Sequence, residues 1–326
     1  MLPQDGECVP LLEVNDDHIH VIDRGSGDAL LFLHAFPFQA AMWDYQLDAF
    51  EATHRCLAVD MPGFGGSEPL AGEKPATMQR WARLVVAALD QLGVDQVTAV
   101  GCSMGGYLAM ALLRHHPDRV AKLVLVDTRA LSDDGPGAAR RTDTQQQIRS
   151  GSELTSLAKS LVESQLSAGS MTRTDLVSYV HALAEGATPE GWIGALDAMK
   201  TRPDSMLLLR QADVPGLVIV GELDRITPIA DARSLRLFLK GELVVIPNVG
   251  HLPNLEDPIA FNEALASFLG VDLTAVEVAE DEAVEAVEPE AVEPAPEAAA
   301  EVTDEVEATG PAAAGDVTGS GTDAAE

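Results

Sequence analysis

The stretch QVTAVGCSMG, residues 96–105, places a serine between a predicted strand and a predicted helix. Its first half is short and apolar, as a buried strand is, and the helix that follows must end before Pro117. Ser103 therefore falls on a tight strand-to-helix turn, where Gly101 and Gly105 keep bulk away. The pattern predicts a nucleophilic serine, with N–H groups of the following helix directed at the place where an oxyanion would form.

A serine hydroxyl is a weak nucleophile without a base. His251 lies in NVGHLPNLEDP, just after a strand predicted at 242–246, so its loop can bring the imidazole over Ser103. A lone loop histidine is more often structural, but the serine motif and the chain order serine, acid, histidine favour a base here. We therefore predict that His251 is the general base.

The base in turn needs an acid that orients it. The strand predicted at 216–221 leads into the sequence GELD. Within it, Asp224 is preferred over Glu222, because the acid in such loops lies several residues past the strand. Asp127, at the end of the preceding predicted strand, is a third candidate.

The loop after the strand predicted at 29–34 is expected to supply a second oxyanion donor. It reads His34-Ala35-Phe36-Pro37. The backbone N–H of Phe36, together with that of Met104, could hold a carbonyl oxygen as it becomes charged, and one such donor is typically worth roughly 3–4 kcal/mol. We expect His34 to hold this loop by hydrogen bonds.

Runs rich in Val, Ile and Leu alternate with longer amphipathic stretches, which predicts an α/β fold: a mostly parallel sheet with helices on both faces. Strands are expected at 8–14, 17–23, 29–34, 55–60, 96–101, 121–127, 216–221 and 242–246. Helices are expected at 41–52, at 76–92 with Thr77 as the cap, from 104 onwards, at 229–239 and at 257–269.

Residues 132–209 show four helix-like segments and no strand, one of them opened by Thr188-Pro189-Glu190 as cap and first turn. An all-helical insertion of this length predicts a cap or lid, although a simple surface excursion remains an alternative. The predicted organisation is a core in two parts, 1–131 and 210–270, with the cap between them.

The end of the chain, residues 271–326, differs in composition from the rest. It holds 17 acids and no Lys, Arg, His or aromatic residue, and it repeats Ala-Val-Glu and Glu-Pro units. Such a segment has too few large apolar residues to offset its chain entropy, so we predict a disordered acidic tail. The first 270 residues then carry a net charge of −14 out of the −31 of the whole chain.

Composition also limits the partners. The chain has 52 Asp and Glu against 21 Lys and Arg, which argues against nucleic acid as a partner. No run of eighteen apolar residues and no signal-peptide pattern is found, and three widely spaced cysteines imply no disulfide framework. We expect a cytoplasmic protein with no membrane partner.

The pairs His18/His20 and His115/His116 lack further ligands, so no metal is expected.

Five segments together resemble the α/β-hydrolase family. They are HAFP (34–37), DMPGFGGS (60–67), GCSMGG (101–106), GELD (221–224) and VGHLPNLEDP (249–258). The resemblance covers about residues 15–270 and is similar to the branch of small esterases and 3-oxoadipate enol-lactonase-like enzymes with a short helical cap.

This resemblance implies an eight-stranded sheet, a triad of Ser103, Asp224 and His251, oxyanion donation from Phe36 and Met104, and no cofactor. Ala35 departs from the pattern, since many relatives have glycine at that place. Haloalkane dehalogenases and epoxide hydrolases attack with a carboxylate, and the serine at position 103 speaks against both.

The predicted function is hydrolysis of a small carboxylic ester or lactone through an acyl-enzyme on Ser103. Carbon–carbon bond hydrolysis and cofactor-free haloperoxidase-type chemistry would use the same triad. A non-catalytic binding module with an acidic interaction tail, whose partner is unknown, is the alternative from another class. Trp43, Trp192 and Leu252, together with Met104, could line the substrate pocket, with core packing as the equal alternative for each.

Deleting everything after Gly270 should leave the fold and the turnover of a neutral ester unchanged. The last predicted helix ends at that glycine, and the 17 acids beyond it have no counterions of their own. Melting temperature and turnover of a neutral p-nitrophenyl ester, measured for both forms, test this. A large drop in either would show that the tail docks on the fold.

Overall fold

The computed structural model describes residues 11–14, 16–72 and 75–273. Contacts divide the chain after Asp281, and the part beyond it, residues 282–326, lies outside the described residues. The predicted disordered tail also lies outside them from residue 274 onwards. The architecture below is therefore that of the first unit alone.

The core of this unit is a single eight-stranded sheet with the order β1-β2-β4-β3-β5-β6-β7-β8. The strands β1 and β2 form an antiparallel pair, β2 runs antiparallel to β4, and all other neighbours are parallel. The strands are β1 (Leu11–Val14), β2 (Asp17–Arg24), β3 (Ala29–Leu33), β4 (Arg55–Val59), β5 (Val97–Cys102), β6 (Val120–Val126), β7 (Gly216–Gly221) and β8 (Glu242–Ile246). The predicted mostly parallel sheet is confirmed.

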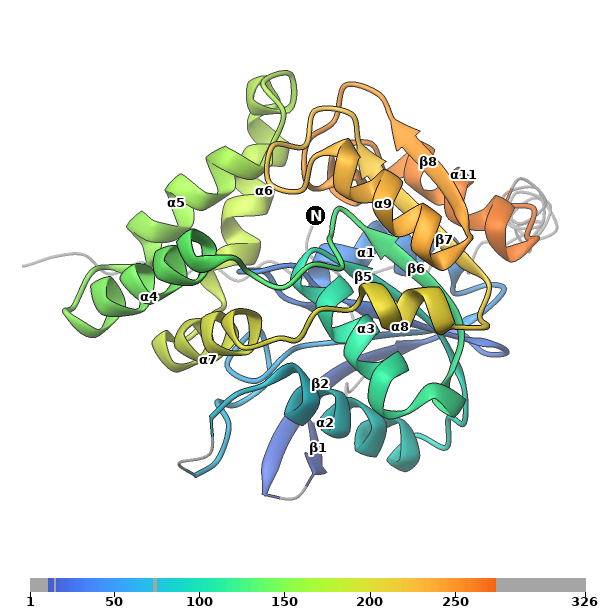
Figure 1. Cartoon of the computed structure of the whole chain (residues 1–326), viewed down its shortest axis with the longest axis horizontal. Coiled ribbons are helices and arrows are strands. Elements are labelled where there is room, and N and C mark those ends of the chain that lie inside the picture. Colours follow the sequence, from blue (N-terminus) through green and yellow to red (C-terminus); the bar gives the residue numbers. More distant parts are fainter. Residues whose placement is uncertain (1–10, 15, 73–74, 274–326) are drawn as a thin grey trace, which may run out of the picture. The chain divides into compact units, whose positions relative to one another are not determined.

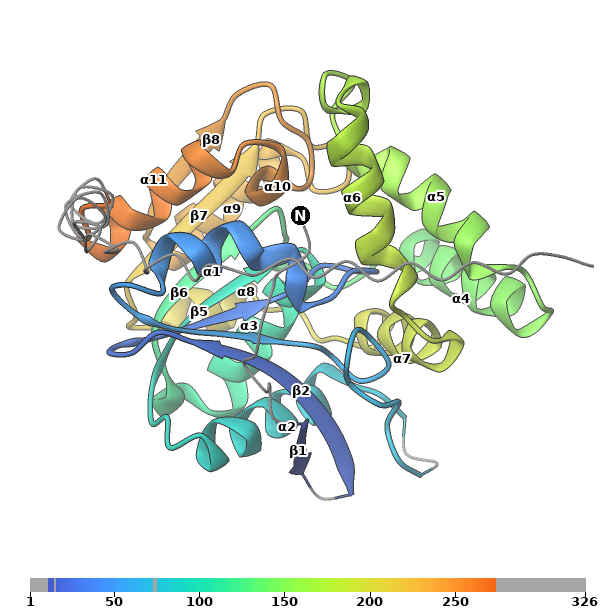
Figure 2. The same cartoon turned by 180° about the vertical axis from the view of Figure 1, so that it is seen from behind.

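Helices cover both faces of the sheet, as predicted (Figures 1 and 2). One face carries α1 (Asp44–Phe50), α10 (Pro253–Glu256) and α11 (Pro258–Leu269). The short 3₁₀ turn η1 (Ala40–Trp43) leads directly into α1. The other carries α2 (Met78–Gln91), α3 (Met104–His115), α8 (Met206–Gln211) and α9 (Ile229–Leu239). A further 3₁₀ turn, η2 (Pro117–Arg119), leads into β6. Thr77 caps α2 as expected, because its hydroxyl oxygen accepts the backbone N–H of Arg80 at 3.1 Å.

The central strands are uniformly apolar because both of their faces are covered. Every residue of β3, β5 and β7 is buried. Parallel strands all end at the same edge, and there the chain must turn into its connecting loops. The loops after β3, β5, β6, β7 and β8 carry Phe36, Ser103, Asp127, Asp224 and His251, in that order.

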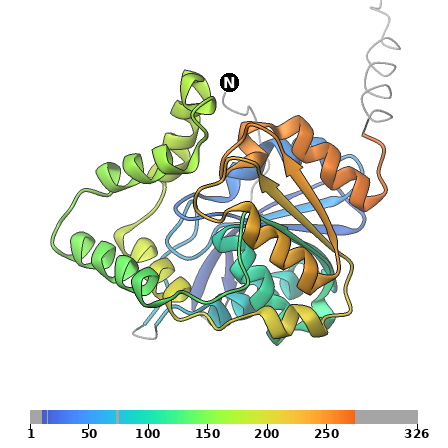
Figure 3. The same cartoon turned by 45° about the horizontal axis from the view of Figure 1, so that its top comes forward.

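Residues 132–209 form helices and turns without a strand. The helices are α4 (Gly135–Arg149), α5 (Leu154–Gln165), α6 (Thr174–Glu185) and α7 (Pro189–Lys200), with the 3₁₀ turn η3 (Ser170–Thr172) before α6, and α8 begins inside this range (Figure 3). Thr188 caps α7 as predicted, accepting the N–H of Gly191 at 3.0 Å. Its own N–H donates to the carbonyl of Gly63 at 2.8 Å, which joins α7 to the glycine-rich loop after β4.

None of the helices in the described residues is long and apolar enough to cross a bilayer.

Candidate active site

Ser103 occupies a strained position between β5 and α3. Its backbone has φ 51° and ψ −108°, a conformation that residues with a side chain rarely adopt. A side chain at Gly101 would collide with the carbonyl of Gly105, and one at Gly105 would collide with the carbonyl of Leu33. The two glycines are therefore required by close backbone approach, and the strain presents Ser103 above the sheet edge.

Neighbouring strand ends hold this turn in place. The N–H of Ser103 donates to the carbonyl of Val126 at 2.9 Å, and the hydroxyl of Thr128 donates to the carbonyl of Ser103 at 2.8 Å. Cys102, next to the serine, is fully buried, and burial raises the pKa of its thiol well above the ordinary value. Cys102 is thus a packing residue and not a thiolate nucleophile.

His251 and Asp224 form a buried hydrogen-bonded pair. The distance between His251 Nδ1 and Asp224 Oδ2 is 2.8 Å. The same carboxylate accepts the Thr227 hydroxyl at 2.6 Å and the Ile226 N–H at 2.7 Å. Burial works to raise the pKa of Asp224, but the charge of His251 and these hydrogen bonds outweigh it and lower the pKa to about 2. Asp224 is therefore ionised at neutral pH.

Ser103 and His251 both line a cavity of about 610 Å³ between the sheet edge and the helical insertion. Phe36, Tyr107 and Trp192 line the same cavity. In the described part of the chain, the His251 ring bonds only to Asp224 and Thr227, and no direct bond joins it to Ser103. The predicted nucleophile and base thus face the same cavity, but no hydrogen bond joins them in this structure.

The two other candidate acids are not bonded to His251. Glu222 is exposed, and its carboxylate accepts the N–H of Asn248 at 3.1 Å. Asp127 Oδ1 accepts the N–H of Gly221 at 3.0 Å, and its Oδ2 has no partner among the described residues. Of the three acids, Asp224 alone is bonded to His251.

Asp127 is a fully buried carboxyl group beside Asp224. Burial, followed by the charge of Asp224, raises the pKa of Asp127 well above its ordinary value. A buried carboxylate oxygen without a donor favours the protonated form for the same reason. Both effects favour the protonated form of Asp127 beside the ionised Asp224.

Within the described residues, one group of His, Cys, Asp or Glu side chains is close enough together to hold a metal ion. It consists of Asp127, Asp224 and His251. Their ligand atoms lie within 4.8 Å of one another. The hydrogen bonds above already commit Asp224 and the Nδ1 atom of His251, and the raised pKa of Asp127 disfavours the carboxylate form that a metal ion would need. The donor set therefore fits a metal ion poorly.

The loop after β3 presents the predicted oxyanion donors. Burial lowers the pKa of His34, whose neutral ring accepts the N–H of Met61 at Nε2 and bonds the carbonyl of Ala35 through Nδ1, each at 3.0 Å. His34 thus holds the loop as expected. Within the described residues, the N–H groups of Phe36 and Met104 have no acceptor, so both are available to a ligand.

The predicted pocket residues separate into two groups. Trp192 lines the cavity, and its ring meets that of Phe36 edge-on at 4.7 Å between centroids. Trp43 packs instead against Phe32 in the core, and Leu252 is fully buried outside the cavity lining. Apolar size alone does not distinguish a pocket residue from a core residue, which explains the difference.

The loop that carries His251 is fastened to the helical insertion. The N–H of His251 donates to the carbonyl of Gln165 at 2.8 Å, and the Gln165 side chain donates to the carbonyl of Phe36 at 3.0 Å. Glu256 is buried, and its carboxylate accepts the N–H groups of Gly250 at 2.8 Å and Ser167 at 2.9 Å. Sequence reasoning missed both residues. Gln165 lies in no recognisable motif, and Glu256 lies within VGHLPNLEDP, where only the histidine was singled out.

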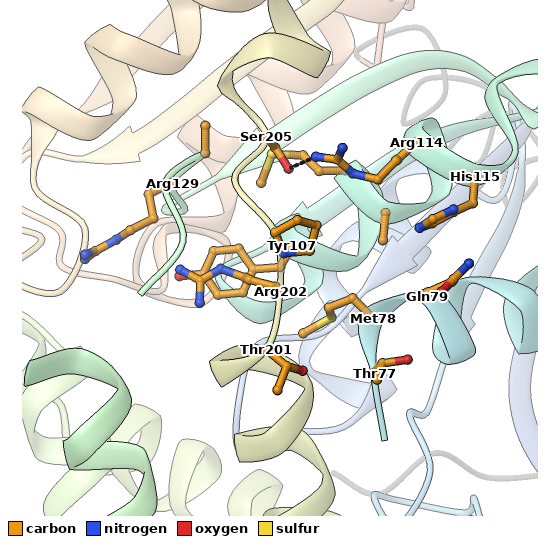
Figure 4. A pocket seen from close by; sticks show the side chains of 14 residues that line it. Thr77, Met78, Gln79, Tyr107, Arg114, His115, Arg129, Thr201, Arg202 and Ser205 are labelled. Atoms are coloured by element: carbon orange, nitrogen blue, oxygen red, sulfur yellow. Dashed lines mark hydrogen bonds between the residues drawn. The ribbon is translucent and has the colours of Figure 1, made fainter. Parts of the chain in front are cut away.

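A second, smaller cavity of about 280 Å³ lies beside α3 (Figure 4). Tyr107 and Arg129 line both cavities. The guanidinium of Arg202 stacks on the Tyr107 ring at 3.9 Å from its centroid and is bonded to Asp133 at 2.7 Å. This stack forms part of the wall between the two cavities.

Comparison with known proteins agrees with the geometry. A model of the α/β-hydrolase fold matches residues 28–258. The chain is an enzyme of the hydrolase class built on this fold. It belongs to the α/β-hydrolase fold family.

Three relatives illustrate the range of the family. The chain is 27% identical over 262 residues to 3-oxoadipate enol-lactonase 2 of Acinetobacter baylyi, covering 79% of this chain and 95% of the relative. It is 31% identical to a 2-hydroxy-6-oxononadienedioate/2-hydroxy-6-oxononatrienedioate hydrolase of Paraburkholderia phymatum, covering 77% and 91%. The malate-bound structure of a thermophilic esterase from Thermogutta terrifontis is 30% identical, with a TM-score of 0.74, covering 78% and 93%.

Asp224→Asn should reduce kcat by orders of magnitude, whereas Glu222→Gln and Asp127→Asn should change it by less than about tenfold. Only the acid bonded to His251 fixes the imidazole tautomer, and in serine proteases the equivalent substitution lowers kcat about 10⁴-fold. Steady-state turnover of one ester by the three variants tests the assignment. A larger loss in Glu222→Gln would identify the other carboxylate as the acid.

Asp127→Asn should raise the melting temperature at pH 7, and the gain should shrink as the pH falls. The raised pKa keeps Asp127 protonated in the folded protein, while the unfolded chain releases that proton above its ordinary pKa, so folding loses stability as the pH rises. Asparagine removes this loss and tolerates the positive φ of 40° at this position. Melting curves from pH 4 to pH 8 measure the gap between variant and wild type. A gap that does not widen with pH would contradict a neutral Asp127.

Proposed function

We propose that this protein hydrolyses a small carboxylic ester or lactone through an acyl-enzyme formed on Ser103. The observation that carries the proposal is the buried His251–Asp224 bond of 2.8 Å beside a strained serine in the same cavity. The esterase and enol-lactonase named among the relatives support ester or lactone chemistry.

In the acylation step, Ser103 Oγ attacks the substrate carbonyl carbon while His251 takes its proton. Because Nδ1 of His251 donates to Asp224, Nε2 carries the lone pair that accepts this proton. The carbonyl oxygen becomes an oxyanion, which the N–H groups of Phe36 and Met104 would bind. The imidazolium then gives its proton to the departing alkoxide, and the acyl group stays on Ser103.

In the deacylation step, water replaces the alcohol. His251 removes a proton from that water, the resulting hydroxide attacks the acyl carbon, and the second tetrahedral oxyanion uses the same two donors. The proton returns to Ser103 Oγ as the acid leaves. Asp224 stays ionised throughout and stabilises the imidazolium, in keeping with its lowered pKa of about 2.

The helical insertion serves as the cap of this site in our proposal. It supplies most of the lining of the active-site cavity, from α4, α5 and α7. An active site covered in this way excludes bulk water and strengthens the electrostatic contacts inside it.

Carbon–carbon bond hydrolysis is a second candidate. The Paraburkholderia relative is named as a hydrolase of 2-hydroxy-6-oxononadienedioate, and the chain covers 91% of it. Such a reaction would use the same serine, base and oxyanion donors on a ketone in place of an ester.

Ser103→Ala should fold normally and lose nearly all turnover, with at most the residual rate that oxyanion donors alone provide. Wild type should react with a fluorophosphonate probe and the variant should not. The substrate class follows from a screen of p-nitrophenyl esters of increasing acyl length beside several lactones and a vinylogous 1,5-diketone. Wild-type activity in the variant would contradict the mechanism, and turnover of the diketone alone would favour the second candidate.

A further inference from the structure

The active-site cavity carries the opposite charge to the protein around it. Four arginines line it against a single aspartate: Arg129, Arg140, Arg141 and Arg225 against Asp133. The first 270 residues carry a net charge of −14. The net negative charge already accounts for solubility and does not explain why arginines gather in one cavity. A ligand of that cavity is the more direct explanation.

The one aspartate of the lining is already neutralised. Asp133 is ion-paired with Arg141 and also with Arg202, the latter at 2.7 Å. Burial works to raise the pKa of Asp133, but its hydrogen bonds and charge interactions with both arginines outweigh this and lower it. The charge of Asp133 is thus shared between two guanidinium groups, and none of it remains for the other arginines of the cavity.

Two of those arginines have no partner in the part of the chain that the structure describes. Arg140 projects from α4 of the insertion, and Arg225 directly follows Asp224 in the loop after β7. Both are exposed, and neither makes a side-chain hydrogen bond or ion pair there. They come from different parts of the fold, one from the insertion and one from the core.

Arg129 is a third, fixed positive group at the same edge. It donates to the carbonyl of Ile226, and its Nε forms an ion pair with Asp231 Oδ2 at 3.5 Å. Figure 4 shows its guanidinium turned away from Arg114 and His115, two basic groups of the second cavity.

We propose that the substrate carries a free carboxylate, bound by Arg140 and Arg225 beside Arg129, while Ser103 attacks its ester or lactone carbonyl. This inference rests on the hydrolase function proposed above. A guanidinium binds a carboxylate by two parallel N–H···O bonds, and such charge-assisted bonds are stronger than those between neutral groups. The substrate class is therefore a monoester or lactone of a dicarboxylic acid.

Matched esters test the charge alone. Monomethyl succinate, glutarate and adipate differ from methyl butyrate, valerate and hexanoate only by a carboxylate in place of the terminal methyl group. Wild type should prefer the charged member of at least one pair by about tenfold or more in kcat/KM. The double variant Arg140→Gln/Arg225→Gln should lower that charged-to-neutral ratio by at least about tenfold, mainly through KM.

Arg149→Gln is the matched control. Arg149 lies on the same helix as Arg140, is exposed and lies outside the cavity lining. It should leave the charged-to-neutral ratio unchanged. A wild-type preference for every neutral ester, or an equal ratio in wild type and double variant, would overturn the proposal while leaving the hydrolase function intact.

Binding separates this proposal from the hydrolase function itself. Glutarate titrated calorimetrically into the full-length Ser103→Ala protein should bind, more weakly as salt is added, and the two arginine substitutions in that background should weaken binding by about tenfold or more. This result would support the carboxylate site even if no ester were hydrolysed. Absence of binding by succinate, glutarate and adipate alike would overturn it even if neutral esters were good substrates.

Discussion

The backbone of Ser103 is the constraint on which the site depends. A side chain at φ 51° is costly, and the turn persists because Gly101 and Gly105 allow the surrounding backbone to close on it and because Val126 and Thr128 bond it from the next strand. The same sheet edge fixes the loops of Phe36, Asp224 and His251, the predicted oxyanion donor, acid and base. The chemistry therefore depends on the register of five parallel strands and not on any one loop.

Electrostatics inside the site rest on two neighbouring aspartates whose pKa values are shifted in opposite directions. The bonds of Asp224 to His251 and Thr227 lower its pKa to about 2, whereas burial raises the pKa of Asp127. The ligand atoms of the two carboxyl groups and of His251 lie within 4.8 Å of one another. A carboxyl group whose pKa is raised by folding costs stability as the pH rises, so the packing of the surrounding core has to offset that cost.

Much of this could be predicted from the sequence. Uniformly apolar runs such as residues 29–33 identify buried parallel strands, and the glycines around Ser103 identify the turn, because both signals are local. The cavity arginines could not be predicted, because Arg140 and Arg225 lie far apart in sequence. They line the same cavity only once the insertion has folded over the core. Trp43 and Leu252 illustrate the opposite error, since both were predicted to line the pocket and lie outside the cavity lining. A large apolar residue packs equally well in a core, so the sequence does not separate the two cases.

Glu256 fastens the helical insertion to the core at one corner. Its carboxylate bridges the base loop at Gly250 and the insertion at Ser167, and lifting the whole insertion would strand that buried charge without donors. The part of the insertion around Ser167 is therefore the part most firmly fastened to the core. Because the N–H of His251 is bonded to the carbonyl of Gln165 beside it, the predicted base is positioned by the folded insertion as well as by its own loop.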